Sequence, residues 1–389
     1  MKKTFYIIGG IIIVILIAIW LFLLFANDST KAEMYNRFGL SGSTEEGIIE
    51  DIIDTIVPDV FQKKYLRQLT TKRVIGYTEV SEASSTLVYF VEGGTGHVYT
   101  IDPMIEGSEN RISNITVPVA TEASLSPDGS RIAVRTGNQT DSKITILTKN
   151  GESFDSYSLG EKIRDFVVDD TGALLYTQVG GTGLFGKEFD IESKTAKAIF
   201  EVPFQEATIV WGKTAQGPHY VYPKTSRYLE GFLYQIQDGT FSRLPASGFG
   251  FSIYALSSSA VFSKIVNGKF TSYITDIKSG ETEELPLNYI PEKCAFGTEA
   301  LYCSFGGDII NDYDFPDNWY RGEISFTDSL WKTTVDTQSN KVVDMFSDSG
   351  REIDGISLHL GRGDELLYLI NKNDHSLWVY EFPKQDTNE

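Results

Sequence analysis

Acidic residues concentrate in one stretch, GGDIINDYDFPDNWYRGEISFTD, which spans residues 306–328. Carboxylate oxygens are the ligands that Ca²⁺ prefers, and the alternation of Asp312 with Asp314 is similar to that of a calcium loop. The glycine turn and the distal glutamate of an EF-hand are missing, so no coordination geometry is defined. The candidate calcium ligands are Asp308, Asp312, Asp314 and Asp317.

Aromatic residues of the same stretch favour a different use. Large aromatic side chains exposed on a loop are typical of binding hot spots. The predicted partner-contact residues are Tyr313, Phe315, Trp319, Tyr320 and Arg321. A plain solvated loop is the third interpretation, and the sequence leaves all three open.

Elsewhere the sequence carries no catalytic motif. It lacks the G-x-S-x-G turn of α/β-hydrolases, and its histidines never occur in HExxH or HxH spacing. These histidines are His97, His219, His359 and His375. GGTG occurs at residues 93–96 and 180–183, but neither copy precedes a helix or a Lys-Ser/Thr pair, so both are predicted to be hairpin turns. We therefore expect a protein that is not an enzyme and that needs no cofactor, calcium apart.

Two cysteines flank the sequence AFGTEALY. If this segment forms a tight hairpin, Cys294 and Cys303 lie nearly opposite each other, and an oxidising compartment would permit a disulfide. The alternative is a pair of buried thiols packed as small apolar side chains.

A strand pattern recurs from about residue 64 onward, clearest in ASLSPDGSRIAVRTGNQTDSKITILTKNGESFDSYSL at residues 123–159. Short runs of Val, Ile, Tyr and Phe alternate with Gly-, Asn- and Asp-rich turns, which is typical of strands. Alignment of the second strand of each copy selects Tyr89, Val134, Tyr176, Tyr222, Phe262, Cys303 and Tyr368. The first five gaps lie near the ~40–45-residue period of a propeller blade, and the last is longer because of the insertion at residues 306–328. The sequence therefore predicts an all-β fold, a seven-bladed β-propeller over residues 63–383.

The two ends of the repeat region are complementary. The last copy supplies three strands before the polar tail at residues 384–389, whereas the first copy is preceded by a spare strand, KKYLRQLT, at residues 63–70. We expect this strand to close the ring beside Trp378, because closure removes an unpaired sheet edge.

The N-terminus predicts a membrane anchor. Residues 5–26 carry no charge and would span ~33 Å as a helix at ~1.5 Å per residue, enough to cross a bilayer. Lys2 and Lys3 precede this segment, so the positive-inside rule keeps residues 1–4 in the cytoplasm and places the remainder outside. A cleaved signal peptide is the alternative, but Leu24 stands where its cleavage site needs a small residue.

Residues 27–62 form a linker in which residues 44–57 have the spacing of an amphipathic helix. Ser43 and Glu46 form a capping box, and Pro58 ends the segment. Its isoleucine stripe must be covered, either by the body of the protein or by a partner helix.

The charge balance excludes one class of partner. The chain has 53 acidic and 34 basic residues, a formal net charge of −19, and no basic stripe. Nucleic-acid binding depends on Lys and Arg that neutralise phosphates, so a nucleic-acid partner is not expected.

The turn and strand SPDGSRIAV at residues 126–134 resemble the repeat of TolB-type, WD40-like propellers, with degenerate copies at residues 169–172 and 361–364. The chain also resembles membrane-anchored bacterial propellers. The resemblance implies an extracytoplasmic scaffold that binds a protein or an envelope component. TolB itself has a cleaved signal and a separate α/β domain, which this chain lacks, so its partner is not transferred. The alternative expectation is a carbohydrate- or small-ligand-binding, or hydrolytic, propeller that uses its central channel.

Overall fold

The computed structural model describes residues 65–383 apart from residues 82–84, 138–141, 161, 182, 257–258, 308–313, 336 and 338. The predicted anchor at residues 5–26, the predicted amphipathic helix at 44–57 and the tail at 384–389 lie outside the described residues. Among those that are described, no helix is long and apolar enough to span a membrane.

The described strands pair antiparallel in six hydrogen-bonded sheets, and each four-stranded sheet runs from an innermost to an outermost strand. In that order, the first three sheets are β2 (Val74–Ser81), β3 (Thr86–Glu92), β4 (Val98–Ile101) and β5 (Asn110–Arg111); β6 (Ala120–Leu125), β7 (Arg131–Gly137), β8 (Ser142–Asn150) and β9 (Ser153–Leu159); and β10 (Asp165–Val168), β11 (Leu174–Val179), β12 (Leu184–Asp190) and β13 (Thr195–Val202).

The next sheet has seven strands, and the last two have four each. They are β14 (Ala207–Val210), β15 (His219–Pro223), β16 (Glu230–Gln237), β17 (Thr240–Leu256), β18 (Ser259–Val266), β19 (Lys269–Asp276) and β20 (Thr282–Glu284); β21 (Cys294–Phe296), β22 (Ala300–Phe305), β23 (Ser329–Thr334) and β24 (Asn340–Met345); and β25 (Gly355–Leu360), β26 (Leu366–Asn371), β27 (Leu377–Glu381) and β1 (Leu66–Thr70).

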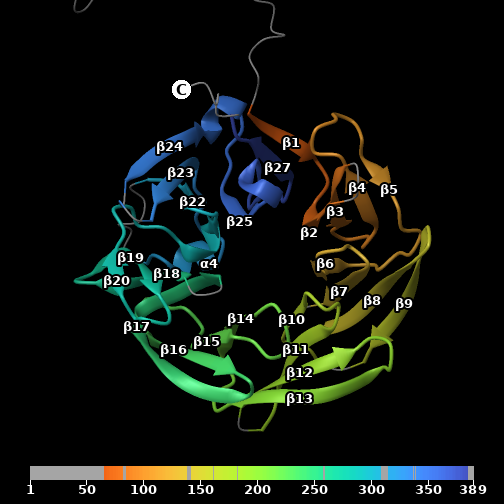
Figure 1. Ribbon diagram of the computed structural model, residues 1–389, viewed down its shortest axis with the longest axis horizontal. Helices are drawn as coiled ribbons and strands as arrows, with labels where there is room; N and C mark the ends of the chain where they lie inside the picture. The colour runs from red at the N-terminus through yellow and green to blue at the C-terminus, as the bar shows by residue number, and fades with distance from the viewer. Residues whose placement is uncertain are drawn as a thin grey trace, which may run out of the picture. The chain divides into compact units, whose positions relative to one another are not determined.

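The sheets stand around a ring, with β2, β6, β10, β14 and β25 nearest its centre (Figure 1). Second strands are buried along most of their length, as in β3, β7 and β11, because a neighbouring sheet covers each face. Outer strands such as β13 and β20 are largely exposed. The seven residues aligned from the sequence all fall on second strands, namely β3, β7, β11, β15, β18, β22 and β26.

Strand β17 explains the seven-stranded sheet. Its first part pairs with β16 as far as Phe249, and its remainder pairs with β18. Gly248 and Gly250 have φ values of 159° and 61° at the junction. The value at Gly250 lies in the left-handed region that favours glycine, so the chain bends there without ending the strand. Strand β17 is thus the outer strand of one four-stranded unit, β14–β17, and the inner strand of the next, β17–β20.

The ring is joined where the described chain begins and ends. Strand β1 lies antiparallel to β27 with Gln68 opposite Trp378, the neighbour that the sequence predicts for this strand. The backbone N–H of Glu381 also donates to the carbonyl of Tyr65. The first strand of the repeat region therefore shares a sheet with the last three.

Short helices occupy a few connections: η2 (Pro291–Lys293), α4 (Asp317–Tyr320), η4 (Phe346–Ser349) and η5 (Arg362–Asp364). Helix α4 lies within the insertion between β22 and β23, on the side of the ring's centre (Figure 1).

Candidate functional site

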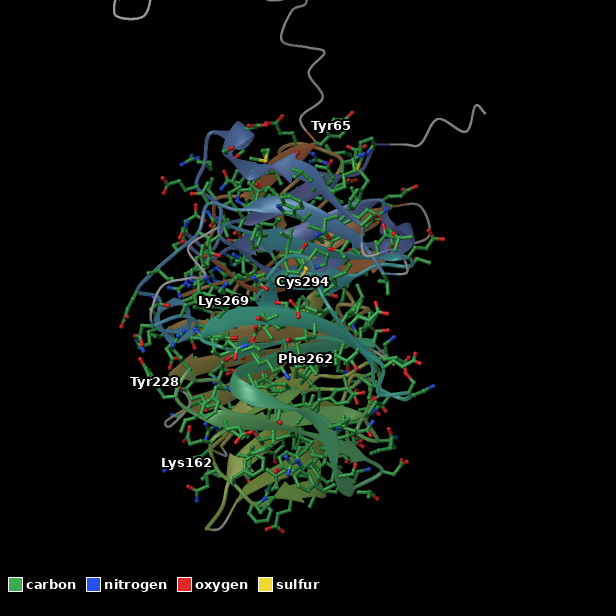
Figure 2. The ribbon with its side chains drawn as sticks, turned by 90° about the vertical axis from the view of Figure 1, so that its left-hand side faces the viewer. Tyr65, Lys162, Tyr228, Phe262, Lys269 and Cys294 are labelled. Atoms are coloured by element: carbon green, nitrogen blue, oxygen red, sulfur yellow. A yellow bond between two sulfur atoms is a disulfide. The ribbon has the colours of Figure 1, made fainter. Side chains whose placement is uncertain are left out.

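Antiparallel connectivity gives the ring two different faces. Loops that connect one sheet to the next emerge on the same face as loops between second and third strands; we call this the crossover face. Figure 2 shows Lys162, from a connection between sheets, and Tyr228, from a loop between second and third strands, along one side of the ring. The insertion at residues 306–328 and both GGTG turns belong to this face.

The insertion does not expose its aromatic residues as the sequence analysis expects. Phe315 is 0% and Trp319 5% exposed, so the prediction is wrong for these two side chains. They pack with Phe270, Ile290 and Phe326 in a small apolar core. The physical reason is that the segment folds back over the loops beneath it, and burying large rings there is worth more than leaving them in water. Tyr313 lies outside the described residues.

The acidic residues of the insertion meet hydrogen-bond donors. Asp314 pairs with Arg321 and accepts from the hydroxyl of Tyr228, while Asp317 accepts from the backbone N–H of Arg227 at 2.6 Å. Asp308 and Asp312 lie outside the described residues. In the part of the chain that the structure covers, no three His, Cys, Asp or Glu side chains are grouped to hold a metal ion.

A buried ionic network holds the insertion in place. Lys293 Nζ lies 2.7 Å from carboxylate oxygens of Asp328 and Asp354, and all three side chains are almost fully buried. Asp354 also accepts from the indole N–H of Trp319 at 3.0 Å, and Lys372 donates to the carbonyl of Trp319 at 2.8 Å. Burial raises the pKa of Asp328 to about 6, which still leaves it mostly ionised at neutral pH. We call these residues, namely Lys293, Asp328, Asp354 and Lys372, the buried network.

Tyr320 links the insertion to a second polar cluster. Its side chain is partly exposed, and its hydroxyl donates to Glu292 Oε1 at 2.8 Å. Burial raises the pKa of Glu292 to about 7, whereas hydrogen bonds from Tyr320 and Tyr222 lower it. Glu292 lies in η2, directly before the inner strand β21. The insertion therefore places a phenol against a carboxyl group at the start of an inner strand.

Two more carboxyl groups extend this cluster along neighbouring inner strands. Burial, and then the nearby charge of Glu122, raise the pKa of Asp165 to about 6, while Arg135 lowers it. Burial likewise raises the pKa of Glu122, whose Oε2 lies 3.2 Å from Arg135 Nη1. Tyr222 interacts electrostatically with both Asp165 and Glu292 and so connects the two halves. The channel-mouth cluster, as we name it, comprises Glu122, Asp165, Glu292, Tyr222 and Tyr320.

Sequence reasoning missed the channel-mouth cluster, except for Tyr320. Glu122 and Asp165 stand in the short strands ATEASL and DFVV, and no spacing relates them to Glu292 along the chain. The usable signal was a carboxylate at the start of a predicted inner strand. Carboxyl groups with perturbed pKa values that lie close to phenols are typical of functional sites.

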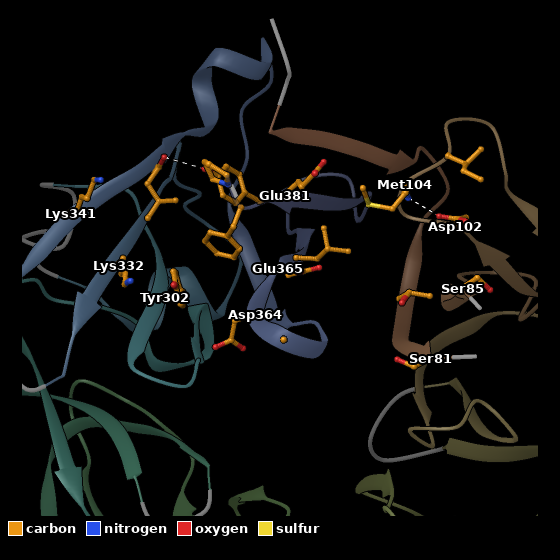
Figure 3. A pocket seen from close by; sticks show the side chains of 18 residues that line it. Ser81, Ser85, Asp102, Met104, Tyr302, Lys332, Lys341, Asp364, Glu365 and Glu381 are labelled. Carbon is orange, nitrogen blue, oxygen red and sulfur yellow. Dashed lines mark hydrogen bonds between the residues drawn. The ribbon is translucent and has the colours of Figure 1, made fainter. Parts of the chain in front are cut away.

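The opposite face carries a cleft of about 1200 Å³ beside the last sheet (Figure 3). Its walls mix Lys332 and Lys341 with Asp364 and Glu365, and Tyr302 lies between them. The last described residue, Pro383, also lines it. The charged residues of the lining are two lysines, which lie on one side in Figure 3, and four carboxylates, namely Asp102, Asp364, Glu365 and Glu381.

The remaining sequence-predicted residues have structural surroundings. A disulfide joins Cys294 to Cys303 across the first two strands of their sheet, with a Cα–Cα distance of 4.1 Å. In the first GGTG turn, the N–H groups of Gly93 and Gly94 donate to the carbonyls of Arg73 and Ala120. Those two amides are therefore engaged within the protein rather than turned toward a ligand.

Comparison with known proteins identifies the fold. No protein-family model and no curated protein matches the sequence. Among solved structures, the chain is similar to YCF48 bound to a D1 peptide, with a TM-score of 0.55 and 11% identity over 82% of this chain and 96% of that one. It is also similar to the β-propeller domain of the trilobed protease from Pyrococcus furiosus (TM-score 0.52, 13% identity, 82% and 99% covered) and to virginiamycin B lyase from Staphylococcus aureus (0.51, 14%, 82% and 98%).

Identities this low show the fold alone. The fold is a β-propeller. The all-β propeller predicted from the repeats is thereby confirmed, and the number of blades, the TolB-type repeat and the anchor go beyond what these similarities show.

Proposed function

We propose that this protein is a non-catalytic scaffold that binds another protein or an envelope component on its crossover face. The observation that carries this proposal is the distribution of exposed large apolar side chains. Seven of them belong to crossover-face loops or the adjoining strand ends: Val119, Val179, Tyr228, Leu229, Phe249, Tyr320 and Met345. Exposed apolar groups are typical of protein contact sites, and in the structure of YCF48 a propeller of similar fold is bound to a peptide.

Tyr228, Leu229 and Phe249 form the densest part of this surface. Glu230 pairs with Phe249 across β16 and β17, and Tyr228 and Leu229 directly precede Glu230. The three apolar residues are therefore neighbours at the same end of these two strands. Their side chains are 67%, 59% and 48% exposed. The insertion borders them, because Arg227 donates to the carbonyl of Phe315 at 3.0 Å. The corrected contact surface therefore centres on these residues, with Tyr320 and Arg321 retained from the sequence prediction.

The architecture proposed for this scaffold has seven blades of TolB-type repeat. Two observations support it: seven aligned residues lie on seven second strands, and β17 joins two four-stranded units through its glycine bend. An experimental structure with six or eight radial sectors would contradict this count.

The proposed location is outside the cytoplasmic membrane, tethered by residues 5–26. The disulfide supports it, because such bonds persist in oxidising compartments and are rare in the cytosol. Tyr65, through which any tether is connected, pairs with Glu381 at the end of β27, opposite the crossover face.

A membrane-fractionation experiment tests the tether. The full chain is expected to sediment with membranes and to resist carbonate extraction, whereas residues 27–389 alone are expected to be released. In intact cells, protease or a membrane-impermeant label should reach the propeller. A full chain that remains in the cytosolic fraction with two free thiols would contradict the proposed location.

Paired variants test the binding face. Tyr228→Ser with Leu229→Ser should abolish in-cell crosslinking to the partner that co-purifies with the unmodified chain. Met104→Ser with Ile105→Ser is the matched control, since these adjacent residues are 56% and 58% exposed on the opposite face. Capture lost only in the control pair would place the partner on the wrong face for this proposal.

A second candidate function is binding or hydrolysis of a carbohydrate or another small ligand in the channel. The coupled carboxyl groups of Glu122 and Asp165 favour it, since a close acid pair with raised pKa values can serve as general acid and base. Direct assay of the full chain against glycan substrates, with Asp165→Asn as control, distinguishes this candidate from the scaffold.

A further inference from the structure

The charge of the channel-mouth cluster is not balanced by its surroundings. Glu122 and Asp165 share one nearby cation, Arg135, which itself pairs with Glu122, and among the described residues no cation acts on Glu292. The groups that act on Glu292 are the phenols of Tyr320 and Tyr222, which carry no positive charge. A cation placed here would meet the carboxyl groups of Asp165 and Glu292, from which burial removes much of the surrounding water.

Unpartnered buried atoms provide a second and independent sign of a ligand. Thr177 is 0% exposed, its Oγ1 has no hydrogen-bond partner among the described residues, and it stands directly opposite Asp165 in the strand register. Glu292 Oε2 is also buried and has no hydrogen-bond partner in the described part of the chain, since the hydroxyl of Tyr320 donates to Oε1 instead. Buried polar atoms are nearly always paired, so the unpaired hydroxyl of Thr177 and the unpaired carboxylate oxygen of Glu292 indicate that a polar group of a ligand binds near them.

The chain already shows how a cationic donor is held. The guanidinium of Arg135 contacts Glu122, donates to the carbonyl of Arg164 at 2.8 Å and lies 4.9 Å above the ring of Phe166. Carboxylate, carbonyl and aromatic face together form the usual surroundings of a guanidinium. Glu292, with Tyr320 and Tyr222 beside it, offers carboxylate and aromatic groups of the same kinds without a resident cation.

We propose that the channel-mouth cluster binds the cationic side chain of an arginine or lysine presented by the partner that docks on the crossover face. This inference rests on the proposed scaffold function and adds the chemistry of the partner: a basic residue flanked by apolar ones. The basic residue enters the channel mouth, and its apolar neighbours lie on Tyr228, Leu229 and Phe249. The net charge of −19 favours the approach of such a partner.

The test uses small probes on the full chain in detergent micelles, so that it does not require the partner. N-acetyl-arginine amide is compared by calorimetry with N-acetyl-citrulline amide, its neutral isostere, and with maltose. We expect the arginine derivative to bind about tenfold or more tightly than the citrulline derivative. Binding should release protons near pH 6.5, because a bound cation lowers the pKa of the carboxyl groups; two buffers of different ionisation enthalpy measure this.

Variants decide the site. Glu292→Gln and Asp165→Asn should each weaken arginine-amide binding about fivefold or more, whereas Glu299→Gln, an exposed carboxyl on the opposite face, should leave it unchanged. Equal binding of the citrulline derivative, or unchanged binding by both variants, would overturn the inference. Binding of maltose alone would overturn it in favour of the channel-ligand candidate.

The two proposals fail separately. If the Tyr228 and Leu229 variant loses its partner but the arginine amide never binds, the scaffold stands and the cation site is wrong. If the arginine amide binds but partner capture is indifferent to Tyr228 and Leu229, the cation site stands and the docking surface is wrong.

Discussion

Two groups of ionisable residues lie at the crossover face, and they are built in opposite ways. In the buried network, each carboxylate has an ammonium partner: Lys293 contacts Asp328 and Asp354, and Lys372 lies 3.8 Å from Asp354. In the channel-mouth cluster, Asp165 shares Arg135 with Glu122, and Glu292 has only phenols around it. The insertion contacts both groups through consecutive residues, Trp319 and Tyr320.

The difference separates a structural role from a binding role. A buried ion pair whose remaining hydrogen bonds are satisfied fixes geometry, and it has no capacity left for a ligand. A desolvated carboxyl group without a neighbouring cation, such as Glu292, costs stability in the empty protein, and a cationic ligand can restore that stability. The buried network therefore holds the insertion in place through Trp319, and this places the hydroxyl of Tyr320 against Glu292 in the channel-mouth cluster.

The largest expected effect comes from breaking the buried network. Asp354→Asn should lower the free energy of unfolding by about 3–5 kcal/mol, because Lys293 and Lys372 would lose a shared counter-charge in a buried site. Urea denaturation measures this change. Glu299→Gln, which removes an exposed carboxylate, should change stability by less than about 0.5 kcal/mol. A loss below about 1 kcal/mol for Asp354→Asn would mean that the network does not hold the insertion.

The second-largest effect is the pH dependence of stability that Glu292, in the channel-mouth cluster, causes. The pKa of Glu292 is raised from 4.5 to about 7, so the folded state retains its proton more tightly than the unfolded state. Stability attributable to this group is therefore present below pH 4.5 and is lost as pH rises toward 7. Glu292→Gln avoids that loss, so the variant should gain on the order of 1–3 kcal/mol over the unmodified protein between about pH 4.5 and pH 8.

Denaturation series at several pH values check this prediction, again with Glu299→Gln as control. If the stability difference between Glu292→Gln and the unmodified chain is flat from about pH 4.5 to pH 8, Glu292 is not desolvated. The contrast between the two clusters would then disappear.

A smaller effect separates the two lysines of the buried network. Lys372 is partly exposed, and it donates to the carbonyls of Trp319 and Ile324 at 2.8 and 3.3 Å. Lys372→Met keeps the aliphatic length but removes these bonds, so a loss of about 1–2 kcal/mol is expected by urea denaturation. Lys278→Met, on an exposed turn, should be nearly neutral. A loss as large as that of Asp354→Asn would show that Lys372, rather than Lys293, is the main cation of the network.

The sequence predicted the features that repeat. Period and strand composition identify the propeller, because every copy must present a second strand that is buried on both faces, and Tyr89, Tyr176 and Tyr368 mark three of them. The position of the closing strand follows from the same count of strands. The insertion was recognised for the complementary reason, that it interrupts the period.

The sequence could not predict what the insertion and the inner strands do together. Exposed and buried aromatics look alike in a loop, and Trp319 is buried only because Asp354, from the next sheet, accepts its indole N–H. Glu122 and Asp165 lie on inner strands of two consecutive sheets and Glu292 directly precedes a third inner strand, so only the arrangement of the sheets around the ring relates these segments. Local patterns carry no information about that arrangement.

The smallest expected effect tests the contact between the two clusters. The hydroxyl of Tyr320 donates to Glu292 and so favours its ionised form. Tyr320→Phe should raise the pKa of Glu292 above its value in the unmodified chain, at a cost in stability below about 1 kcal/mol. Carbon-detected NMR titration of the glutamate carboxyl groups measures the shift.

Tyr228→Phe is the control: it removes a similar bond to Asp314 elsewhere on the insertion, and it should leave the pKa of Glu292 unchanged. If both variants shift Glu292 equally, the insertion acts on the channel mouth by moving as a whole. If neither variant shifts the pKa of Glu292, Tyr320 has no effect on the ionisation of Glu292, and the proposed link between the buried network and the channel-mouth cluster is wrong.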